Sequence, residues 1–448
     1  MIKDKLFGTD GIRGRIDSDH LQPQNILKLG SVIADIINNN DVKKAVVIAR
    51  DTRSSGLYFE NALIAGLTSK GIDCIILGVL PTGALASLTR EKKAAFGIMI
   101  SASHNPHQDN GLKFFDSNGF KISKELEEEI EKRFFDEALV KINLETLPGK
   151  IFIEDAIGPY LSKFNNLREE LKQRKIVIDC ANGAASYIIS EIFHQFSNIK
   201  LIGASPDGQN INLNAGTECL ENLKKEVLKN EADLGIAFDG DADRVIIIDE
   251  KGLIVDGDIL MAIMAIDLKN LGTLKKDTIV ATIMSSKSLD NALAPFGIKV
   301  SRADVGDRNV MKRMCELGAN FGGESSGHMI FSDKSSTADG IIIAMELIDI
   351  WLRDGRSFSD ICSFFVPTPR VLKDIEVNKK PSLDLMPNTN KALIDANTLL
   401  KDSGRAFLRY SGTEMKARLL VEAQTENDCQ KIAEKIIWEF HQEIGFVE

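Results

Sequence analysis

A chain of 448 residues, 44% hydrophobic and 27% charged, has the composition of a folded globular protein and is too long for one compact core. Its formal net charge of -10 argues against a nucleic-acid-binding protein, which would need clustered Lys and Arg. The six cysteines are scattered without a CxxC pair, so we expect neither a zinc site nor a disulfide framework. The charged start of the chain and the lack of a run of about 20 apolar residues predict a cytoplasmic protein, away from membranes.

An apolar run, a polar turn and a helical stretch follow one another three times along the chain. The runs are Val46–Ala49, Ile176–Ile178 and Ile279–Ala281. The helices after them are predicted at Gly56–Thr68, Ala185–Phe196 and Leu289–Ala294. This recurrence predicts α/β units with mixed or parallel sheets.

Turn-rich breaks divide the chain near residues 150, 256 and 368, the last at Pro367 and Pro369, where two prolines favour an extended linker. We therefore expect α/β domains at residues 1–150, 151–256 and 257–368. Residues 369–448 are expected to form a smaller α+β domain. Its strands are predicted at Phe407–Arg409 and Ala417–Glu422, and its last helix around Asn427–Phe440.

The motif Ser-His-Asn-Pro at Ser103–Pro106 follows an apolar run, Phe96–Ile100, that reads as a buried strand. Ser103 would then lie just beyond the carboxyl end of that strand, where open α/β sheets place ligand chemistry. Its hydroxyl could attack a substrate or carry a phosphoryl group. The G-x-S-x-G elbow of hydrolases is absent, and His104, as the next residue, is poorly placed to act as a base on Ser103.

Three aspartates alternate with small residues in the segment Asp-Gly-Asp-Ala-Asp-Arg, residues 239–244. Alternate side chains of an extended segment point the same way, so this aspartate triplet (Asp239, Asp241 and Asp243) can converge on one hard cation. Mg²⁺ fits better than Ca²⁺ or Zn²⁺, because Arg244 stands where an EF-hand needs glycine and no His or Cys is adjacent. A solvated acidic turn is the alternative.

Three further loops combine glycines with charged or hydroxyl side chains. The segment Arg409–Glu414, with Arg418 close behind, favours an anion site over a plain surface hairpin, because arginine forks and loop N–H groups match phosphate. The segment Gly322–His328 either binds sugar hydroxyls or is a flexible turn. Arg13, within the glycine-rich segment Phe7–Gly14, and Arg308 could contact an anion, or they belong to an ordered turn and a helix cap. A cation site together with anion loops is what phosphoryl transfer requires.

Together these motifs resemble the α-D-phosphohexomutase superfamily, whose signatures SASHNP, DGDADR, GESSGH and RYSGTE all occur here in order. The resemblance implies four domains around a central cleft, the first three alike in fold, with a hinge near Pro367–Pro369. It implies that Ser103 is a phosphoserine and binds one Mg²⁺ together with the aspartate triplet. Lys113 is the expected general acid or base, with His328 as the other candidate, and His104 and Arg244 complete the catalytic set. The candidate substrate contacts are Arg13, Arg308, Glu324, Ser326, His328, Arg409, Ser411, Gly412, Thr413 and Arg418.

Within the superfamily, the segments Phe7–Gly14 and Val305–Arg308 are most similar to bacterial phosphoglucosamine mutases. That resemblance implies reversible conversion of glucosamine 6-phosphate to glucosamine 1-phosphate through a bisphosphate intermediate, which feeds UDP-N-acetylglucosamine and cell-wall precursor synthesis. It also implies glucosamine or glucose 1,6-bisphosphate as activator. Two residues depart from that subfamily: Ser325, where it usually has Gln, and Met415, where it usually has Pro.

Two alternatives stay open. One is a phosphomannomutase or phosphoglucomutase with the same chemistry, and the other is a non-catalytic sugar-phosphate-binding protein. In each case a phosphosugar is the expected partner, with a homodimer as an open option.

Overall fold

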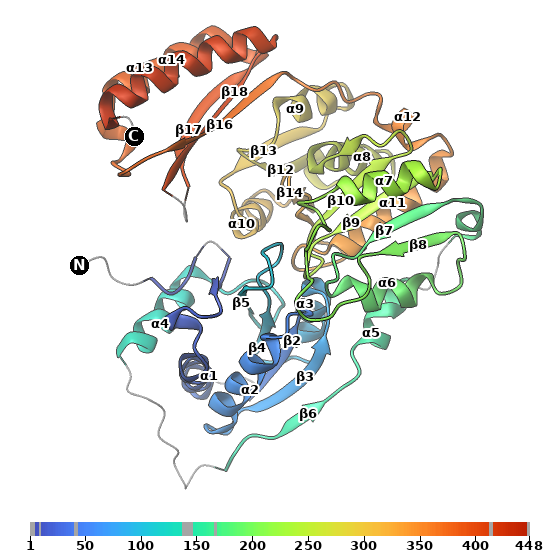
Figure 1. Ribbon diagram of the computed structural model, residues 1–448, viewed down its shortest axis with the longest axis vertical. Coiled ribbons are helices and arrows are strands. Elements are labelled where there is room, and N and C mark those ends of the chain that lie inside the picture. Colours follow the sequence, from blue (N-terminus) through green and yellow to red (C-terminus); the bar gives the residue numbers. More distant parts are fainter. Residues whose placement is uncertain are drawn as a thin grey trace. The chain divides into compact units, whose positions relative to one another are not determined.

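The computed structural model describes residues 5–8, 10–39, 44–136, 147–164, 168–411 and 415–445. The chain divides into a larger unit, Met1–Met284 with Phe296–Ser363, and a smaller unit, Ser285–Pro295 with Phe364–Glu448. The larger unit carries three sheets and the smaller unit one, in chain order from blue to red (Figure 1). Across the described ranges, every helix is too short or too polar to span a membrane.

The first sheet has six strands in the order β1, β5, β4, β2, β3, β6. Its parallel strands are β2 (Ala45–Arg50), β3 (Asp73–Val79), β4 (Phe96–Ile100) and β6 (Ile151–Ile153). The antiparallel strands are β1 (Ile12–Arg15) and β5 (Asp109–Phe115). The helices of this part are α1 (Pro23–Asn38), α2 (Gly56–Thr68), α3 (Thr82–Glu91) and α4 (Lys124–Asp136).

Continuous apolar sequence explains the centre of this sheet, because every residue of β4 is buried and a parallel strand covered on both faces needs no polar side. Helices α1 and α2 pack closely at two glycines. A Cβ atom on Gly66 would lie 2.1 Å from the carbonyl oxygen of Leu27, and one on Gly30 would lie 2.7 Å from that of Leu63. Larger side chains there would push the two helices apart.

The second sheet has the order β11, β10, β9, β7, β8, and the third has the order β13, β12, β14, β15. The second is built from β7 (Ile176–Asp179), β8 (Ile199–Ile202), β9 (Leu234–Phe238), β10 (Val245–Asp249) and β11 (Ile254–Val255), with α5 (Ile157–Leu161), α6 (Ala185–Phe193) and α7 (Glu221–Lys229). The third is built from β12 (Thr278–Thr282), β13 (Lys299–Ala303), β14 (Phe321–Gly323) and β15 (Met329–Phe331), with α8 (Gly257–Asn270), α10 (Asp307–Leu317), α11 (Gly340–Asp354) and α12 (Phe358–Cys362). Both sheets contain parallel and antiparallel pairs.

The smaller unit has a three-stranded antiparallel sheet in the order β16, β18, β17. Its strands are β16 (Arg370–Glu376), β17 (Arg405–Tyr410) and β18 (Lys416–Glu422). Helices α13 (Pro387–Leu400) and α14 (Glu426–Ile444) lie on one side of the sheet, as the red ribbons of Figure 1 show, and share one apolar core with it. Helix α9 (Lys287–Leu293) also belongs to this unit, and the carboxylate of Glu422 accepts hydrogen bonds from the Lys287 N–H at its start.

These observations confirm the expected fold class of three α/β parts with mixed sheets and a smaller α+β part. Helix α6 ends three residues earlier than expected, because the N–H of Phe196 turns back to the carbonyl of Phe193. Strand β6 joins the first sheet although it begins after residue 150. The domain boundaries, the central cleft and the hinge stay predictions.

Candidate active site

The loops that follow the central strands of the first two sheets meet within the larger unit. Ser103 lies just beyond β4, and the aspartate triplet begins directly after β9. The Oγ of Ser103 donates a hydrogen bond of 2.5 Å to Oδ2 of Asp239, although 136 positions separate the two residues. From the third sheet, His328 pairs with Arg244 in an isolated antiparallel bridge. The structure thus brings together three segments that the sequence singled out separately. They are the serine loop (residues 101–109), the metal loop (residues 239–244) and the sugar loop (residues 322–328).

The aspartate triplet is suited to a metal ion. One carboxylate oxygen from each of its members lies within 4.8 Å of the others, and all three residues are buried. Among the described residues, no hydrogen-bond donor reaches Oδ1 of Asp241 or Oδ1 of Asp243. Burial, and then the charges of Asp243 and Asp241, raise the pKa of Asp239 to about 8. Crowded carboxylate oxygens without donors fit a hard cation such as Mg²⁺.

Lys113 lies between two members of the triplet. Its Nζ donates to Oδ2 of Asp241 at 2.6 Å and to Oδ2 of Asp243 at 2.5 Å. Burial by itself lowers the pKa of Lys113, but the carboxylates of Asp241, Asp243 and Asp10 outweigh it and hold the pKa above its usual value. Lys113 is therefore an ammonium group in this arrangement.

A closed ring of alternating charges surrounds this lysine. From Lys113 the ring passes to Asp10 at 3.6 Å, on to Lys121, and from Lys121 to Asp307 at 2.5 Å. His328 closes it, with Nε2 4.0 Å from Asp307 and 3.4 Å from Asp243. Burial lowers the pKa of His328, but Asp243 and Asp307 outweigh that effect and raise it. Because the ring takes residues from all three sheets, it can hold these three parts of the larger unit in register.

Sequence reasoning assigned no role to Asp10, Lys121 or Asp307. Asp10 and Asp307 lie in the two segments that were singled out for Arg13 and Arg308. The carboxylates in these segments were visible, but only the arginines were considered as functional residues. Lys121 lies in an ordinary polar stretch beyond β5, and nothing in the sequence marks it.

His104 contacts Ser103 despite being its neighbour in the chain. Its Nδ1 lies 3.4 Å from Oγ of Ser103. The two side chains approach each other because Ser103 has a left-handed backbone (φ 52°), so the alternation of an extended strand does not apply. The expectation that His104 is poorly placed to act as a base on Ser103 stays a prediction. Burial, and then the charges of Arg244 and Arg13, lower the pKa of His104 to about 3, so the imidazole is neutral.

Three predicted arginines lie around this centre, each with a carboxylate partner. Arg13 pairs with Asp10, Arg244 pairs with Glu218 at 3.1 Å, and Arg308 forms a two-pronged pair with Glu127 of α4. In each arginine Nε is buried and has no hydrogen-bond partner among the described residues. Arg308 is therefore held by a carboxylate in this conformation, and its contact with substrate stays a prediction.

The sugar loop is ordered by its own glutamate. Oε1 of Glu324 accepts a hydrogen bond of 2.9 Å from the Gly306 N–H, and Oγ of Ser326 donates to Oε2 of Glu324 at 3.4 Å. These contacts fix the carboxylate that the sequence predicted to bind sugar hydroxyls.

The predicted phosphate contacts of the last domain lie in the smaller unit. Arg409 of β17 stands directly opposite Arg418 of β18. The N–H of the buried Ser411 donates to the carbonyl of Lys416 at 2.8 Å, which turns the chain at the end of β17. Gly412 and Thr413 lie outside the described residues.

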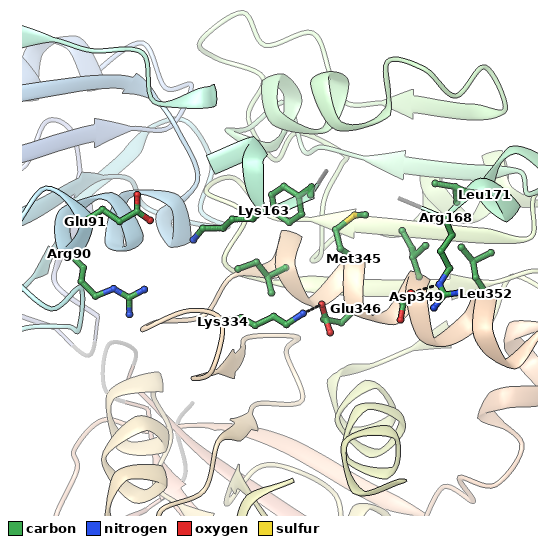
Figure 2. Close-up of a pocket in the computed structure, with 13 residues that line it drawn as sticks. Arg90, Glu91, Lys163, Arg168, Leu171, Lys334, Met345, Glu346, Asp349 and Leu352 are labelled. Atoms are coloured by element: carbon green, nitrogen blue, oxygen red, sulfur yellow. Dashed lines mark hydrogen bonds and ion pairs between the residues drawn. The ribbon is translucent and has the colours of Figure 1, made fainter. Parts of the chain in front are cut away.

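A separate groove of about 570 Å³ lies between α3 and α11 (Figure 2). Lys334 pairs there with Glu346, and Arg168 pairs with Asp349 at 2.5 Å. Among the described residues that line it, none belongs to the predicted motifs. The predicted site residues that the structure describes therefore lie outside this groove.

Comparison with known proteins agrees with this geometry. Four domain families of phosphoglucomutase/phosphomannomutase match in order: alpha/beta/alpha domain I at residues 4–141, domain II at 156–252, domain III at 256–367 and the C-terminal domain at 372–437. The chain belongs to the phosphoglucomutase/phosphomannomutase family. The predicted resemblance to phosphohexomutases, the enzyme class and the fold class are thereby confirmed.

Among similar curated proteins is a phosphoglucosamine mutase of Chlamydia muridarum, 42% identical, with 99% of this chain and 98% of the relative covered. Another is a phosphoglucosamine mutase of Myxococcus xanthus, 42% identical, with 96% of each chain covered.

Solved structures agree in fold. A phosphoglucomutase/phosphomannomutase family protein from Burkholderia thailandensis has a TM-score of 0.80 at 21% identity, with 100% of this chain and 99% of that chain covered. An Aspergillus fumigatus N-acetylphosphoglucosamine mutase in complex with GlcNAc-6P and magnesium has a TM-score of 0.67 at 16% identity, with 98% and 96% covered.

Proposed function

We propose that this chain is a phosphoglucosamine mutase, which interconverts glucosamine 6-phosphate and glucosamine 1-phosphate through a phosphoserine at position 103. The observation that carries the proposal is the 2.5 Å hydrogen bond from Ser103 to Asp239, inside a buried triplet of carboxylates. The curated relatives at 42% identity over nearly the whole chain support the amino sugar as substrate.

The proposed reaction moves one phosphoryl group at a time. The bond between Ser103 Oγ and phosphorus breaks while a sugar hydroxyl oxygen bonds to phosphorus, which gives a sugar bisphosphate and a free serine. The hydroxyl proton leaves to a base, and Ser103 Oγ takes up a proton. The bisphosphate then reorients, and its other phosphoryl group returns to Ser103, so the enzyme regains its starting state.

Lys113 is the proposed acid for this proton transfer. Its ammonium form carries the proton that a departing oxygen needs, and the hydrogen bonds to Asp241 and Asp243 hold Nζ in place. In the reverse half-reaction the same group, once deprotonated, serves as the base. His104, neutral and 3.4 Å from Ser103 Oγ, is the proposed polar neighbour that orients the serine side chain.

The aspartate triplet and Ser103 would hold Mg²⁺, because their oxygens are the ligands this ion prefers. When bound, Mg²⁺ supplies positive charge that stabilises the phosphoryl group in transfer. The arginines at positions 13, 308, 409 and 418, with Glu324, Ser326, His328, Ser411, Gly412 and Thr413, are the proposed substrate contacts. Arg244 is proposed to steady the phosphoserine.

A substrate panel tests the proposal. Initial rates would be measured with glucosamine, mannose and glucose 6-phosphates, in the presence of Mg²⁺ and glucose 1,6-bisphosphate. We expect the amino sugar to have the highest kcat/KM. If it were turned over far more slowly than the others, the chain would instead be a phosphomannomutase or phosphoglucomutase.

A serine variant tests the phosphoserine itself. We expect Ser103→Ala to abolish turnover and intact-mass analysis of the wild type to find one phosphate that this variant lacks. Ser54→Ala is the matched control, because Ser54 is exposed on the loop after β2. A Ser103→Ala protein with full turnover would overturn the mechanism. A wild-type protein with no phosphate on Ser103 and no turnover in the presence of bisphosphate would be a sugar-phosphate-binding protein.

A further inference from the structure

The backbone of Ser103 has an unusual conformation. Its φ of 52° lies in the left-handed region, which costs free energy for any residue with a Cβ atom. Such a conformation persists only where surrounding contacts enforce it. The N–H of Ser103 donates to Oγ of Ser101 at 2.8 Å, and that hydroxyl donates to Oδ2 of Asp51 at 2.7 Å. Side chains therefore hold the amide side of Ser103.

Arg53 holds the carbonyl side. Its side chain is fully buried, and its Nε pairs with Oδ2 of Asp51 at 2.9 Å. Its Nη2 donates to the carbonyl oxygens of Ser103, at 3.0 Å, and Asn105, at 2.8 Å. Its Nη1 donates to the carbonyls of Pro106 and Asp109, so one guanidinium binds four carbonyls of the serine loop. A lysine, with three donors on one nitrogen, cannot span this set.

Asn212 contacts the same carbonyls from the second sheet's side of the unit. Its Nδ2 donates to the carbonyl oxygens of Ser103, at 2.8 Å, and Asn105, at 3.0 Å. The carbonyl oxygen of Ser103 thus accepts from both Arg53 and Asn212, which uses both of its lone pairs. It also packs against the metal loop, since a Cβ on Gly240 would lie 2.5 Å from it.

We propose that Arg53 and Asn212 are positioning residues for phosphoryl transfer, forming a two-sided clamp on the carbonyls of Ser103 and Asn105. The clamp keeps Ser103 left-handed, and this conformation directs its Oγ toward Asp239. Loosening it lets the serine relax to ordinary backbone conformations, so the phosphoryl group leaves the transfer geometry. Because neither side chain hydrogen-bonds any described residue among the proposed substrate contacts, the loss appears in kcat and not in KM. The inference rests on the proposed role of Ser103 as phosphate carrier.

Asn212→Asp is the decisive variant. It keeps the shape and the tolerance for a left-handed backbone (φ 58°), but it replaces the donating amide by an oxygen that faces two carbonyl oxygens. We expect kcat to fall by about 10- to 100-fold, as for a reacting group displaced by about 1 Å, with KM for the sugar phosphate changed by less than about twofold.

Asn214→Asp is the matched control. Asn214 is also left-handed (φ 52°) and lies two positions along the same loop, but its side chain is exposed. This variant makes the same change of charge and should keep the wild-type kcat. An Asn212→Asp protein whose kcat stays within about twofold of that control would overturn the proposal. A change in KM of about 10- to 100-fold with kcat unchanged would also overturn it.

The arginine is tested by Arg53→Lys, with Arg50→Lys as control, because the Arg50 side chain pairs with Glu60 and, in the described part of the chain, makes no hydrogen bond to the serine loop. We expect Arg53→Lys to slow the phosphorylation of Ser103 by glucose 1,6-bisphosphate by at least about tenfold, and intact-mass analysis over time would measure this rate. In Arg53→Ala, added guanidinium should restore part of the rate. Normal phosphorylation in a folded Arg53→Lys protein would contradict the clamp. If Arg53 variants do not fold, Asn212→Asp decides alone.

Failure of the clamp differs from failure of the proposed function. Where Ser103→Ala is inactive but both clamp variants are normal, only the clamp is wrong. Where Ser103→Ala stays fully active, the phosphoserine mechanism itself is wrong.

Discussion

Thr82, at the start of α3, should tune the affinity of the aspartate triplet for Mg²⁺. Its hydroxyl donates to Oδ2 of Asp241 at 2.5 Å, and its N–H donates to the carbonyl of Asp241 at 3.0 Å. Both contacts cross from the first sheet's domain to the metal loop, and Thr82 is almost fully buried. The perturbation is Thr82→Val, which removes the hydroxyl and keeps the shape and the N–H.

The magnitude follows from the kind of bond that is lost. A hydrogen bond to a charged group contributes about 1.5–3 kcal/mol. Removing such a partner of a metal ligand commonly lowers metal affinity by about 10- to 100-fold, which corresponds to about 1.4–2.7 kcal/mol. The two routes agree, so we expect the Mg²⁺ dissociation constant to rise by about 10-fold or more.

The assay is calorimetric titration with Mg²⁺, together with the rise in melting temperature that Mg²⁺ produces, since neither depends on turnover. Thr89→Val is the matched control, because Thr89 is buried in the same helix but donates only to the carbonyl of Leu85. Thr82→Ser should restore the affinity. A Thr82→Val protein that binds Mg²⁺ within about twofold of the Thr89→Val protein would refute the reasoning.

Three further predictions concern stability, specificity and the metal. Tyr160→Phe should destabilise the larger unit by about 1.5–3 kcal/mol, because the Tyr160 hydroxyl donates to the buried carboxylate of Asp339 at 2.8 Å. Urea unfolding would measure this loss of stability, and a loss no larger than that of Tyr187→Phe, at an exposed tyrosine, would contradict the prediction. Ser325→Gln should raise the ratio of kcat/KM for glucosamine 6-phosphate over glucose 6-phosphate by about tenfold, and an unchanged ratio would remove position 325 from the determinants of sugar choice. Chelation with EDTA should abolish turnover and Mg²⁺ should restore it, whereas in Asp241→Asn the rise in melting temperature with Mg²⁺ should be lost; a chelated protein with full activity would exclude the metal role.

Local sequence patterns predicted the elements well where one pattern fixes one structure. The apolar run Phe96–Ile100 is strand β4 with the same bounds, and Gly56–Thr68 is helix α2 with the same bounds. Such elements depend on burial and periodicity within a few residues, so the local sequence suffices. The end of α6 was misjudged because a turn hydrogen bond, invisible in the apolar pattern, stops the helix at Phe193.

The chemical motifs could also be recognised from the sequence, because Ser103 and the aspartate triplet follow apolar strands closely. The partners of these residues could not. The loop carbonyls that Arg53 holds begin 50 positions away, Asp241 lies 159 positions from Thr82, and the carbonyls that Asn212 holds lie 107 and 109 positions away. Each of the three looks like an ordinary turn or helix-start residue. A polar turn after the strand β2 was visible, but nothing showed which carbonyls its arginine would reach.

The sequence by itself determined the fold class and the family and singled out the candidate reacting groups, because these depend on short motifs and on local apolar patterns. Only the tertiary structure decided which charges meet. It closed the ring through Asp10, Lys121 and Asp307, gave Lys113 its two carboxylates, and turned Ser103 into a left-handed conformation beside His104. The physical reason is that pKa values and backbone strain depend on atoms within a few ångströms, and folding brings those atoms together from residues far apart in the chain.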